Sequence, residues 1–77
     1  MKALVECVLC MAKGLVDDPD AVHAAVAEDG STIELHVAPG DFGKIIGKNG
    51  RTVDALRVIL NAGAAKAGIR CRLEVIE

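Results

Sequence analysis

The segment Lys-Ile-Ile-Gly-Lys-Asn-Gly-Arg-Thr-Val, residues 44–53, constrains the fold of this 77-residue chain more than any other. It places Gly47 and Gly50 directly before an apolar-periodic stretch that predicts a helix from about Arg51 to Lys66. Neither glycine carries a Cβ, so the backbone can adopt strained angles and a phosphate can approach the main chain closely. The first amides of the helix lack partners within it, and the helix dipole favours an anion there. We therefore predict an anion-binding loop between two helices.

Basic and aliphatic side chains surround the predicted loop. Lys48 lies inside it, and Lys44 and Arg51 flank it with mobile positive charge. Aliphatic side chains beside the glycines would form the floor of a groove for bases, with Arg70 or Arg72 at its rim. The predicted binding site therefore comprises Lys44, Ile45, Ile46, Gly47, Lys48, Asn49, Gly50, Arg51 and Val53.

Charge is distributed unevenly along the chain, although the net charge is only −2. Residues 1–42 carry two basic and eight acidic side chains, whereas residues 43–72 carry seven basic and one acidic. This concentration of positive charge around the loop fits a localised phosphate site. Phe42 is the one aromatic residue, which argues against modules that stack bases on Phe, Tyr or Trp side chains.

Hydrophobic periodicity predicts six elements in the order α-β-β-α-α-β. Lys2–Val16 has the period of a helix, which Pro19 cannot continue. Two alternating segments then flank Asp29-Gly30, which is a strong signal for a two-residue hairpin turn. With that turn Glu28 faces Ser31, and three apolar pairs meet on the inner face of the sheet: Val26 with Ile33, Ala24 with Leu35, and Val22 with Val37.

The second half of the chain supplies two helices and a third strand. A short helix around residues 41–46 leads into the loop, and Gly68 ends the helix that follows it. The connection from the second strand to the third is about 30 residues long, which is enough for a parallel crossover. In the last strand we expect four side chains to point inward: Ile69, Cys71, Leu73 and Val75. We expect a single α+β domain over residues 1–77, with a three-stranded mixed sheet and helices packed on one face.

This element order, with a Gly-x-x-Gly loop between the fourth and fifth elements, resembles the type II KH arrangement, in which that loop holds about four single-stranded nucleotides. The whole chain is similar to the stand-alone bacterial KH proteins of the KhpA (YlqC) family. The resemblance rests on Leu-Val-Asp-Asp-Pro, on Pro-Gly-Asp-Phe-Gly-Lys-Ile-Ile-Gly-Lys-Asn-Gly-Arg-Thr and on Ala-Leu-Arg. It implies an RNA-binding, chaperone-like protein that self-associates and pairs with a larger KH protein of the Jag (EloR, KhpB) type. It also implies a link to cell elongation and division, and so to cell shape and cell wall organisation.

Other candidate sites have simpler interpretations. Cys7 and Cys10 have the spacing of a redox pair or of half a metal site, but they lie inside a predicted helix and depart from the family pattern. His23 and His36 would face each other on the outer face of the sheet as a solvated pair without a third ligand. The glycines between residues 40 and 50 fit neither a Walker A loop nor a dinucleotide fingerprint. We predict no metal, no cofactor and no catalytic activity.

The cysteine count and the apolar stretches of the sequence indicate the cellular compartment. Three cysteines, an odd number, favour a reducing environment. No secretory signal is recognisable, and the longest apolar stretch, Val8–Ala12, is too short to span a bilayer. We expect a cytoplasmic protein without a membrane span.

We expect a non-catalytic, sequence-tolerant, single-stranded RNA-binding protein. The alternative is a protein-interaction module in which RNA binding is incidental, and the acidic net charge keeps this alternative open.

The helix predicted from Arg51 to Lys66 has two apolar sets. The residues with the spacing of a core-facing stripe are Val53, Leu56, Leu60 and Ala64. A monomer would leave four other apolar residues exposed on the flanks of this helix: Val58, Ile59, Ala62 and Ala65. Such a flank on so small a domain predicts a two-fold symmetric homodimer.

Overall fold

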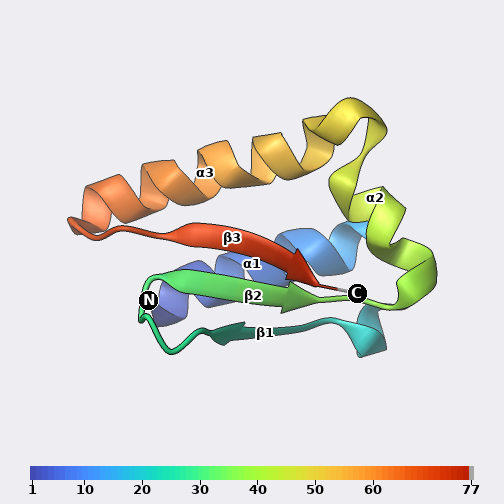
Figure 1. The fold of residues 1–77 in the computed structure, drawn as a ribbon, viewed down its shortest axis with the longest axis horizontal. Coiled ribbons are helices and arrows are strands. Elements are labelled where there is room, and N and C mark those ends of the chain that lie inside the picture. Colours follow the sequence, from blue (N-terminus) through green and yellow to red (C-terminus); the bar gives the residue numbers. More distant parts are fainter. Residues whose placement is uncertain (77) are drawn as a thin grey trace.

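The computed structural model describes residues 1–76, within which the chain forms three α-helices and one three-stranded sheet (Figure 1). The helices and strands are α1 (Lys2–Leu15), β1 (His23–Val26), β2 (Thr32–His36), α2 (Phe42–Ile46), α3 (Arg51–Ala67) and β3 (Arg72–Ile76). Short 3₁₀ turns precede β1, α2 and α3; they are η1 (Pro19–Ala21), η2 (Pro39–Asp41) and η3 (Lys48–Gly50). The α-β-β-α-α-β order is the one predicted from the sequence.

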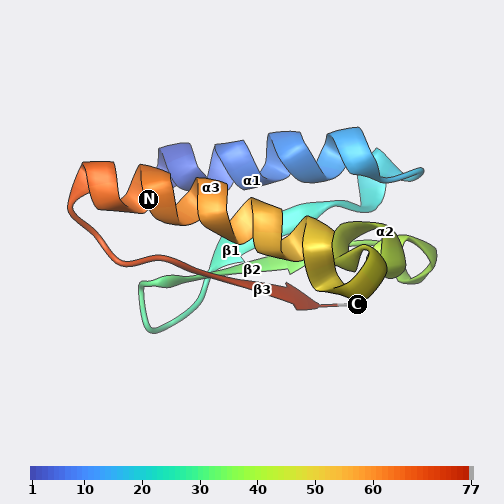
Figure 2. The same ribbon diagram turned by 90° about the horizontal axis from the view of Figure 1, so that it is seen from above.

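The sheet has the strand order β1-β2-β3, with β1 antiparallel and β3 parallel to β2. Helix α1 packs against β1 and β2, while α3 packs against α1 and β3. Both long helices lie on the same side of the sheet (Figure 2), and α2 lies at the end of the sheet where β3 finishes (Figure 1). The predicted mixed sheet with helices on one face is confirmed.

The hydrophobic core lies between the sheet and the helices. Its largest fully buried side chains come from all of these elements: Val8, Ile33, Leu35, Ile45 and Leu60. The buried face of α3 consists of the four residues that helical spacing predicted, Val53, Leu56, Leu60 and Ala64. The helix that carries the loop at its N-terminus is therefore fixed to the core along its length.

The β1–β2 hairpin has the predicted register. Val26 pairs with Ile33 and Ala24 with Leu35, and the two histidines lie opposite each other as expected. Val26 was expected to point into the core, but it remains 41% exposed because it ends an edge strand of the sheet.

The prediction of a two-residue turn is wrong, because the turn of this hairpin is wider. The Ala27 amide donates to the Thr32 carbonyl (2.8 Å), so the turn beyond this pair consists of the four residues 28–31. A two-residue type I′ turn needs a positive φ at both central residues, and within this loop only Gly30 has one (75°). The Asp29 carboxylate instead accepts hydrogen bonds from the amides of Ser31 and Thr32, both at 2.9 Å, and these bonds stabilise the wider loop. Both loop lengths give the same register.

The prediction that Ile69 points inward from the last strand is wrong, because this residue lies at the C-terminal end of α3. Ile69 is exposed, and β3 begins only at Arg72. The amides of Gly68 and Ile69 donate to the carbonyls of Ala65 (3.1 Å) and Ala64 (2.9 Å), which is a Schellman motif with Gly68 in the left-handed conformation. Ile69 therefore belongs to the end of the helix and not to the strand.

Candidate functional site

The Gly47–Gly50 loop has a backbone that few residues other than glycine can adopt. Gly47 has a φ of 75° and a ψ of 173°, Asn49 has a φ of 58°, and Gly50 has a φ of 74°. Asn is one of the residues that enter the left-handed region most readily, which explains its presence at position 49. A Cβ built on Gly47 would lie 2.6 Å from Thr52 Cβ, so the loop turns tightly against the first turn of α3.

The N-terminus of α3 is open to an outside acceptor. Its N-cap residue is Gly50, and no side chain of the described residues caps the helix. The first amides of the helix consequently lack a side-chain partner, and the dipole of a 17-residue helix favours a negative charge at this point. Three amides at the loop already have backbone acceptors: those of Gly47 and Gly50 donate to the carbonyls of Gly43 (2.8 Å) and Gly47 (3.2 Å), and that of Arg51 donates to the Lys48 carbonyl. Anion binding by the remaining amides stays a prediction.

The three cations predicted around the loop fall into two groups. Lys48 and Arg51 are exposed and form no ion pair within residues 1–76. Lys44 Nζ lies 3.1 Å from Asp17 Oδ2 and 3.5 Å from Asp41 Oδ1. The hydrogen bond and charge of Asp17 are the main cause of a raised pKa of Lys44. Only the first two cations are thus free of an acidic partner in the part of the chain described.

The aliphatic residues predicted as a groove floor occupy different depths. Ile45 is completely buried and Val53 nearly so, and both belong to the hydrophobic core. Ile46 is partly buried and retains exposed surface beside the loop. The structure therefore places Ile46 at the surface and the other two beneath it.

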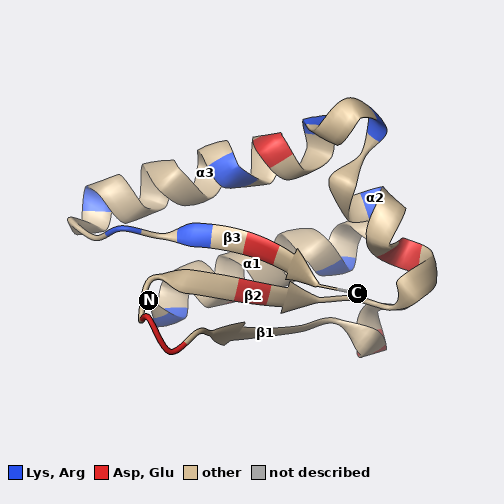
Figure 3. Cartoon of the chain, in the orientation of Figure 1, with Lys and Arg blue, Asp and Glu red and all other residues tan. Residues whose placement is uncertain are grey.

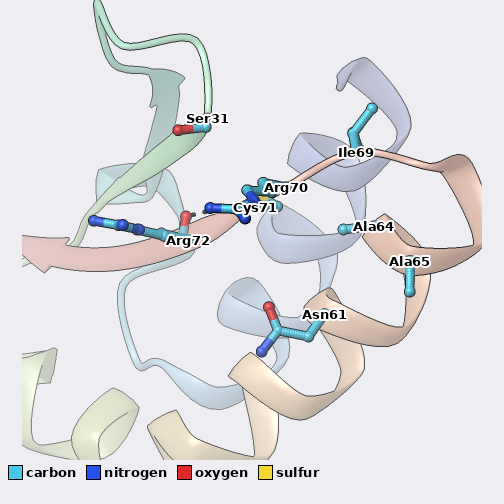
Figure 4. Close-up of a pocket in the computed structure, with 8 residues that line it drawn as sticks. All are labelled: Ser31, Asn61, Ala64, Ala65, Ile69, Arg70, Cys71 and Arg72. Atoms are coloured by element: carbon cyan, nitrogen blue, oxygen red, sulfur yellow. Dashed lines mark hydrogen bonds between the residues drawn. The ribbon is translucent and has the colours of Figure 1, made fainter.

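A hollow of about 360 Å³ lies between α3 and β3. It is lined by Ser31, Asn61, Ala64, Ala65, Ile69, Arg70, Cys71 and Arg72 (Figure 4). A second hollow of about 240 Å³ adjoins it nearer the middle of α3, and both share Asn61, Cys71 and Arg72. Figure 4 shows Asn61 extending from α3 into the space beside β3, whereas the Arg72 side chain extends away from α3. Arg70 and Arg72 therefore line a hollow near the C-terminal end of α3, and not a groove beside the loop at its N-terminal end as predicted.

Sequence reasoning missed Arg57 and Asn61 as candidate groove residues. Arg57 Nη2 donates to the Leu73 carbonyl (3.4 Å) and so spans the gap between α3 and β3; Arg57 Nη1 also lies 3.6 Å from Asp54 Oδ1. The two residues are one turn apart on a polar face of the helix, which was visible in the sequence. The sequence did not show that this face is turned toward the edge of β3, because its direction depends on how α3 packs on the sheet.

The surface charge agrees with the uneven distribution along the chain. Figure 3 shows Lys and Arg on α2, around the loop, along α3 and at the start of β3, while Asp and Glu mark the β1–β2 turn and β2. Asp54 and Glu74 are acidic exceptions on α3 and β3. The part of the chain that carries the loop, residues 43–72, is thus the more basic one.

The remaining candidate sites form no cluster. Cys7 is half-buried, Cys10 is exposed and Cys71 is buried, all as free thiols, and burial raises the pKa of Cys71. Within residues 1–76 no three His, Cys, Asp or Glu side chains are grouped so that they could hold a metal ion. No helix in the same range combines the length and the apolar character needed to cross a membrane.

Comparisons with known proteins agree with this geometry. The sequence pattern of the KhpA/KhpB KH domain matches residues 5–75. The RNA-binding protein KhpA of Halalkalibacterium halodurans is 48% identical over the full length of both chains, and that of Aquifex aeolicus is 47% identical over the same coverage. The RNA-binding protein KhpA of Chlamydia trachomatis is 46% identical over 84% of this chain and 86% of its own. With its fold, its loop and these relatives, the chain belongs to the KhpA/KhpB family of KH domains.

Proposed function

We propose that this chain is a non-catalytic RNA-binding protein that holds about four nucleotides of single-stranded RNA at Gly47-Lys48-Asn49-Gly50. The observation that carries the proposal is the loop itself, in which positive φ angles at three of four residues lead into an uncapped helix N-terminus. The relatives are named RNA-binding proteins, which supports the choice of RNA as ligand.

The proposed path of the RNA follows from the exposure of the side chains. Phosphate binds the loop amides, and Lys48 and Arg51 supply free positive charge. Ile46 contacts a base at the surface, with Ile45 and Val53 supporting it from the core. Further nucleotides run along the hollow between α3 and β3, where Arg57 and Asn61 offer hydrogen-bond donors.

The wider role proposed here rests on family membership. The chain acts in the cytoplasm as an RNA chaperone-like factor, alone as a homodimer and together with a larger KH protein of the Jag (EloR, KhpB) type. Its physiological contribution is to cell elongation and division, and through them to cell shape and cell wall organisation. The KhpA/KhpB family match supports this assignment.

A double substitution in the loop tests the proposed site. Lys48→Asp with Asn49→Asp places two anions where the phosphate binds, and Asp tolerates the left-handed conformation at position 49. We expect the affinity for a short single-stranded RNA to fall at least tenfold, with an unchanged melting temperature. Fluorescence anisotropy at several salt concentrations measures both the affinity and the number of phosphate contacts.

A control separates the site from the effect of net charge. Lys2→Asp with Ala3→Asp makes the same change in charge at two exposed positions at the start of α1. Acidic residues are favourable there, so this variant stays folded. We expect its RNA affinity to remain within about threefold of the wild type. Equal losses in the two double variants would argue against a site at the loop.

The alternative function is a protein-interaction module, and one observation favours it. Val58 and Ile59 are 68% and 50% exposed on α3, which leaves an apolar surface on the helix flank. Under this alternative RNA binding is weak and incidental. The loop variant Lys48→Asp with Asn49→Asp discriminates the two, because incidental binding, which also weakens as salt rises, would not depend on the loop more than on the control positions.

A further inference from the structure

The carboxylate of Asp41 connects the end of α1 to the beginning of α2. It is only 4% exposed, and its two oxygens accept hydrogen bonds from the backbone amides of Asp17 (3.2 Å) and Asp18 (3.0 Å). These amides belong to the segment that follows α1, far from Asp41 in the sequence. Asp41 itself is the last residue before α2. One buried side chain therefore connects the start of the short helix to the segment that ends the long one.

Lys44 is the cation that accompanies this buried carboxylate. Its Nζ lies within ion-pair distance of both Asp41 and Asp17, and it follows Asp41 by about one turn. Burial acts to raise the pKa of Asp41, but the amides of Asp18 and Asp17 and the Lys44 ammonium outweigh it, so the pKa is lowered. The carboxylate thus stays charged at neutral pH with all of these partners in place.

The position of the phosphate-binding loop depends on this cluster because α2 is short. The helix has five residues and ends at Gly47, the first residue of the loop. It is attached to the rest of the molecule by the fully buried Ile45 and, at its start, by Asp41. If Asp41 loses its charge, one good acceptor oxygen remains for the amides of Asp17 and Asp18, and the start of α2 is free to shift.

We propose that Asp41 is a positioning residue for the RNA-binding loop, and that Lys44 serves as its counter-ion and does not bind phosphate. The inference rests on the proposed function, since it concerns the orientation of the same loop. The sequence predicted Lys44 to supply charge to the phosphate together with Lys48 and Arg51, whereas here Lys44 serves Asp41. The phosphate contacts then come from the cations that lack an acidic partner.

The salt dependence of RNA binding distinguishes a positioning lysine from a phosphate ligand. Each phosphate contact on single-stranded RNA contributes about 0.7 to the slope of log affinity against log salt. We expect Lys48→Gln to lower this slope by about 0.7 and Lys44→Gln to leave it unchanged while reducing affinity about threefold. Lys44→Arg keeps the charge beside Asp41 and should restore the affinity. A fall in slope for Lys44→Gln equal to that for Lys48→Gln would overturn the proposal.

Two carboxylate variants test the positioning role itself. Asp41→Asn keeps the shape but supplies one acceptor oxygen for two amides, and we expect at least a fivefold loss of RNA affinity with an unchanged slope. Asp17→Asn leaves Asp41 and the hydrogen bonds that it accepts from the two backbone amides in place. The RNA affinity of this variant should therefore stay within twofold of the wild type. Circular dichroism at the assay temperature shows that each variant is folded. Wild-type affinity in folded Asp41→Asn, or a steeper slope in Asp17→Asn because Lys44 has become a phosphate contact, would contradict the proposal.

Failure of the positioning role and failure of RNA binding at the loop give different results. If Asp41→Asn does not fold, the comparison of Lys44→Gln with Lys48→Gln still decides whether Lys44 binds phosphate. If the wild type binds RNA and Lys48→Gln weakens it, the site stands whatever the result at Lys44. If wild-type binding has no salt dependence, the proposed function itself fails, and the positioning role fails with it.

Discussion

Gly47 and Gly50 are both required by the Gly-x-x-Gly pattern, but their environments differ. At Gly47 a φ of 75° is combined with a ψ of 173°, a region that is essentially restricted to glycine. The same residue also has no room for a Cβ, which would collide with Thr52. Gly50 has ordinary left-handed angles of 74° and 13°, and a Cβ there would meet no atom within 4 Å. Only the first glycine is therefore demanded by both the backbone angles and the packing.

We expect the two glycines to differ in their tolerance of substitution. Gly47→Ala should lower the free energy of unfolding by about 3 kcal/mol, because backbone strain and overlap with Thr52 act together. Gly50→Asn should cost less than about 1 kcal/mol, because Asn enters the left-handed region readily. Urea denaturation of both variants measures the difference. Equal losses would show that Thr52 and the unusual ψ do not constrain Gly47.

The sequence indicated where the loop lies and which of its residues are glycine for conformational reasons, but it did not indicate the partners of the neighbouring side chains. Both glycines and the exposed Lys48 and Arg51 could be identified because the pattern is local. The pairing of Lys44 could not, because Asp17 approaches it only when the segment after α1 folds back onto α2. The depth of the aliphatic residues was likewise hidden, since adjacent isoleucines of one helix turn in different directions. Ile45 enters the core and Ile46 remains at the surface.

At the scale of elements, the alternation of apolar residues predicted the register of the hairpin, and a side chain determined its turn. The Asp29 carboxylate accepts hydrogen bonds from two amides and from the Thr32 hydroxyl (2.8 Å). Bonds of this kind compete with the tight turn that Asp-Gly otherwise favours. The inner and outer faces of both strands are the same for either turn, so the sheet and its core were predictable while the turn was not.

The hairpin turn should contribute a pH-dependent part of the stability. The hydrogen bond from the Ser31 amide, followed by those from Thr32, lowers the pKa of Asp29 in the folded chain. A lowered carboxyl pKa adds stability above the ordinary value of about 3.9 and loses it as the pH falls through the folded-state pKa. We expect Asp29→Asn to be less stable than the wild type at pH 7, with the difference shrinking below about pH 4.

Urea midpoints between pH 2 and pH 7 measure this difference. Glu28→Gln, at the adjacent exposed position, serves as the control and should stay close to the wild type throughout the range. A gap between Asp29→Asn and the wild type that does not change with pH would mean that the ionised carboxylate adds nothing to the turn.

At the scale of the molecule, a short chain carries both a basic loop face and an exposed apolar flank. The core is limited in a domain of this length, which buries about 60% of the surface of its unfolded chain. Val58 and Ile59 lie on a side of α3 that its buried stripe of Val53, Leu56 and Leu60 leaves exposed. Covering that side with a second copy would add buried apolar area without touching the loop at the N-terminus of α3. Self-association and RNA binding are therefore compatible on one helix.

We expect the chain to form a two-fold symmetric homodimer through this flank of α3. Sedimentation velocity at micromolar concentration should give a mass near twice the 8.0 kDa of the chain. Val58→Glu with Ile59→Glu places two charges on the apolar surface and should shift the equilibrium to monomer, with loss of at least tenfold in dimer affinity. Lys13→Glu makes the same change in net charge on exposed α1 and should leave the dimer intact. A wild-type monomer at high concentration would rule the interface out, and a double variant that remains dimeric would place the contact on another surface.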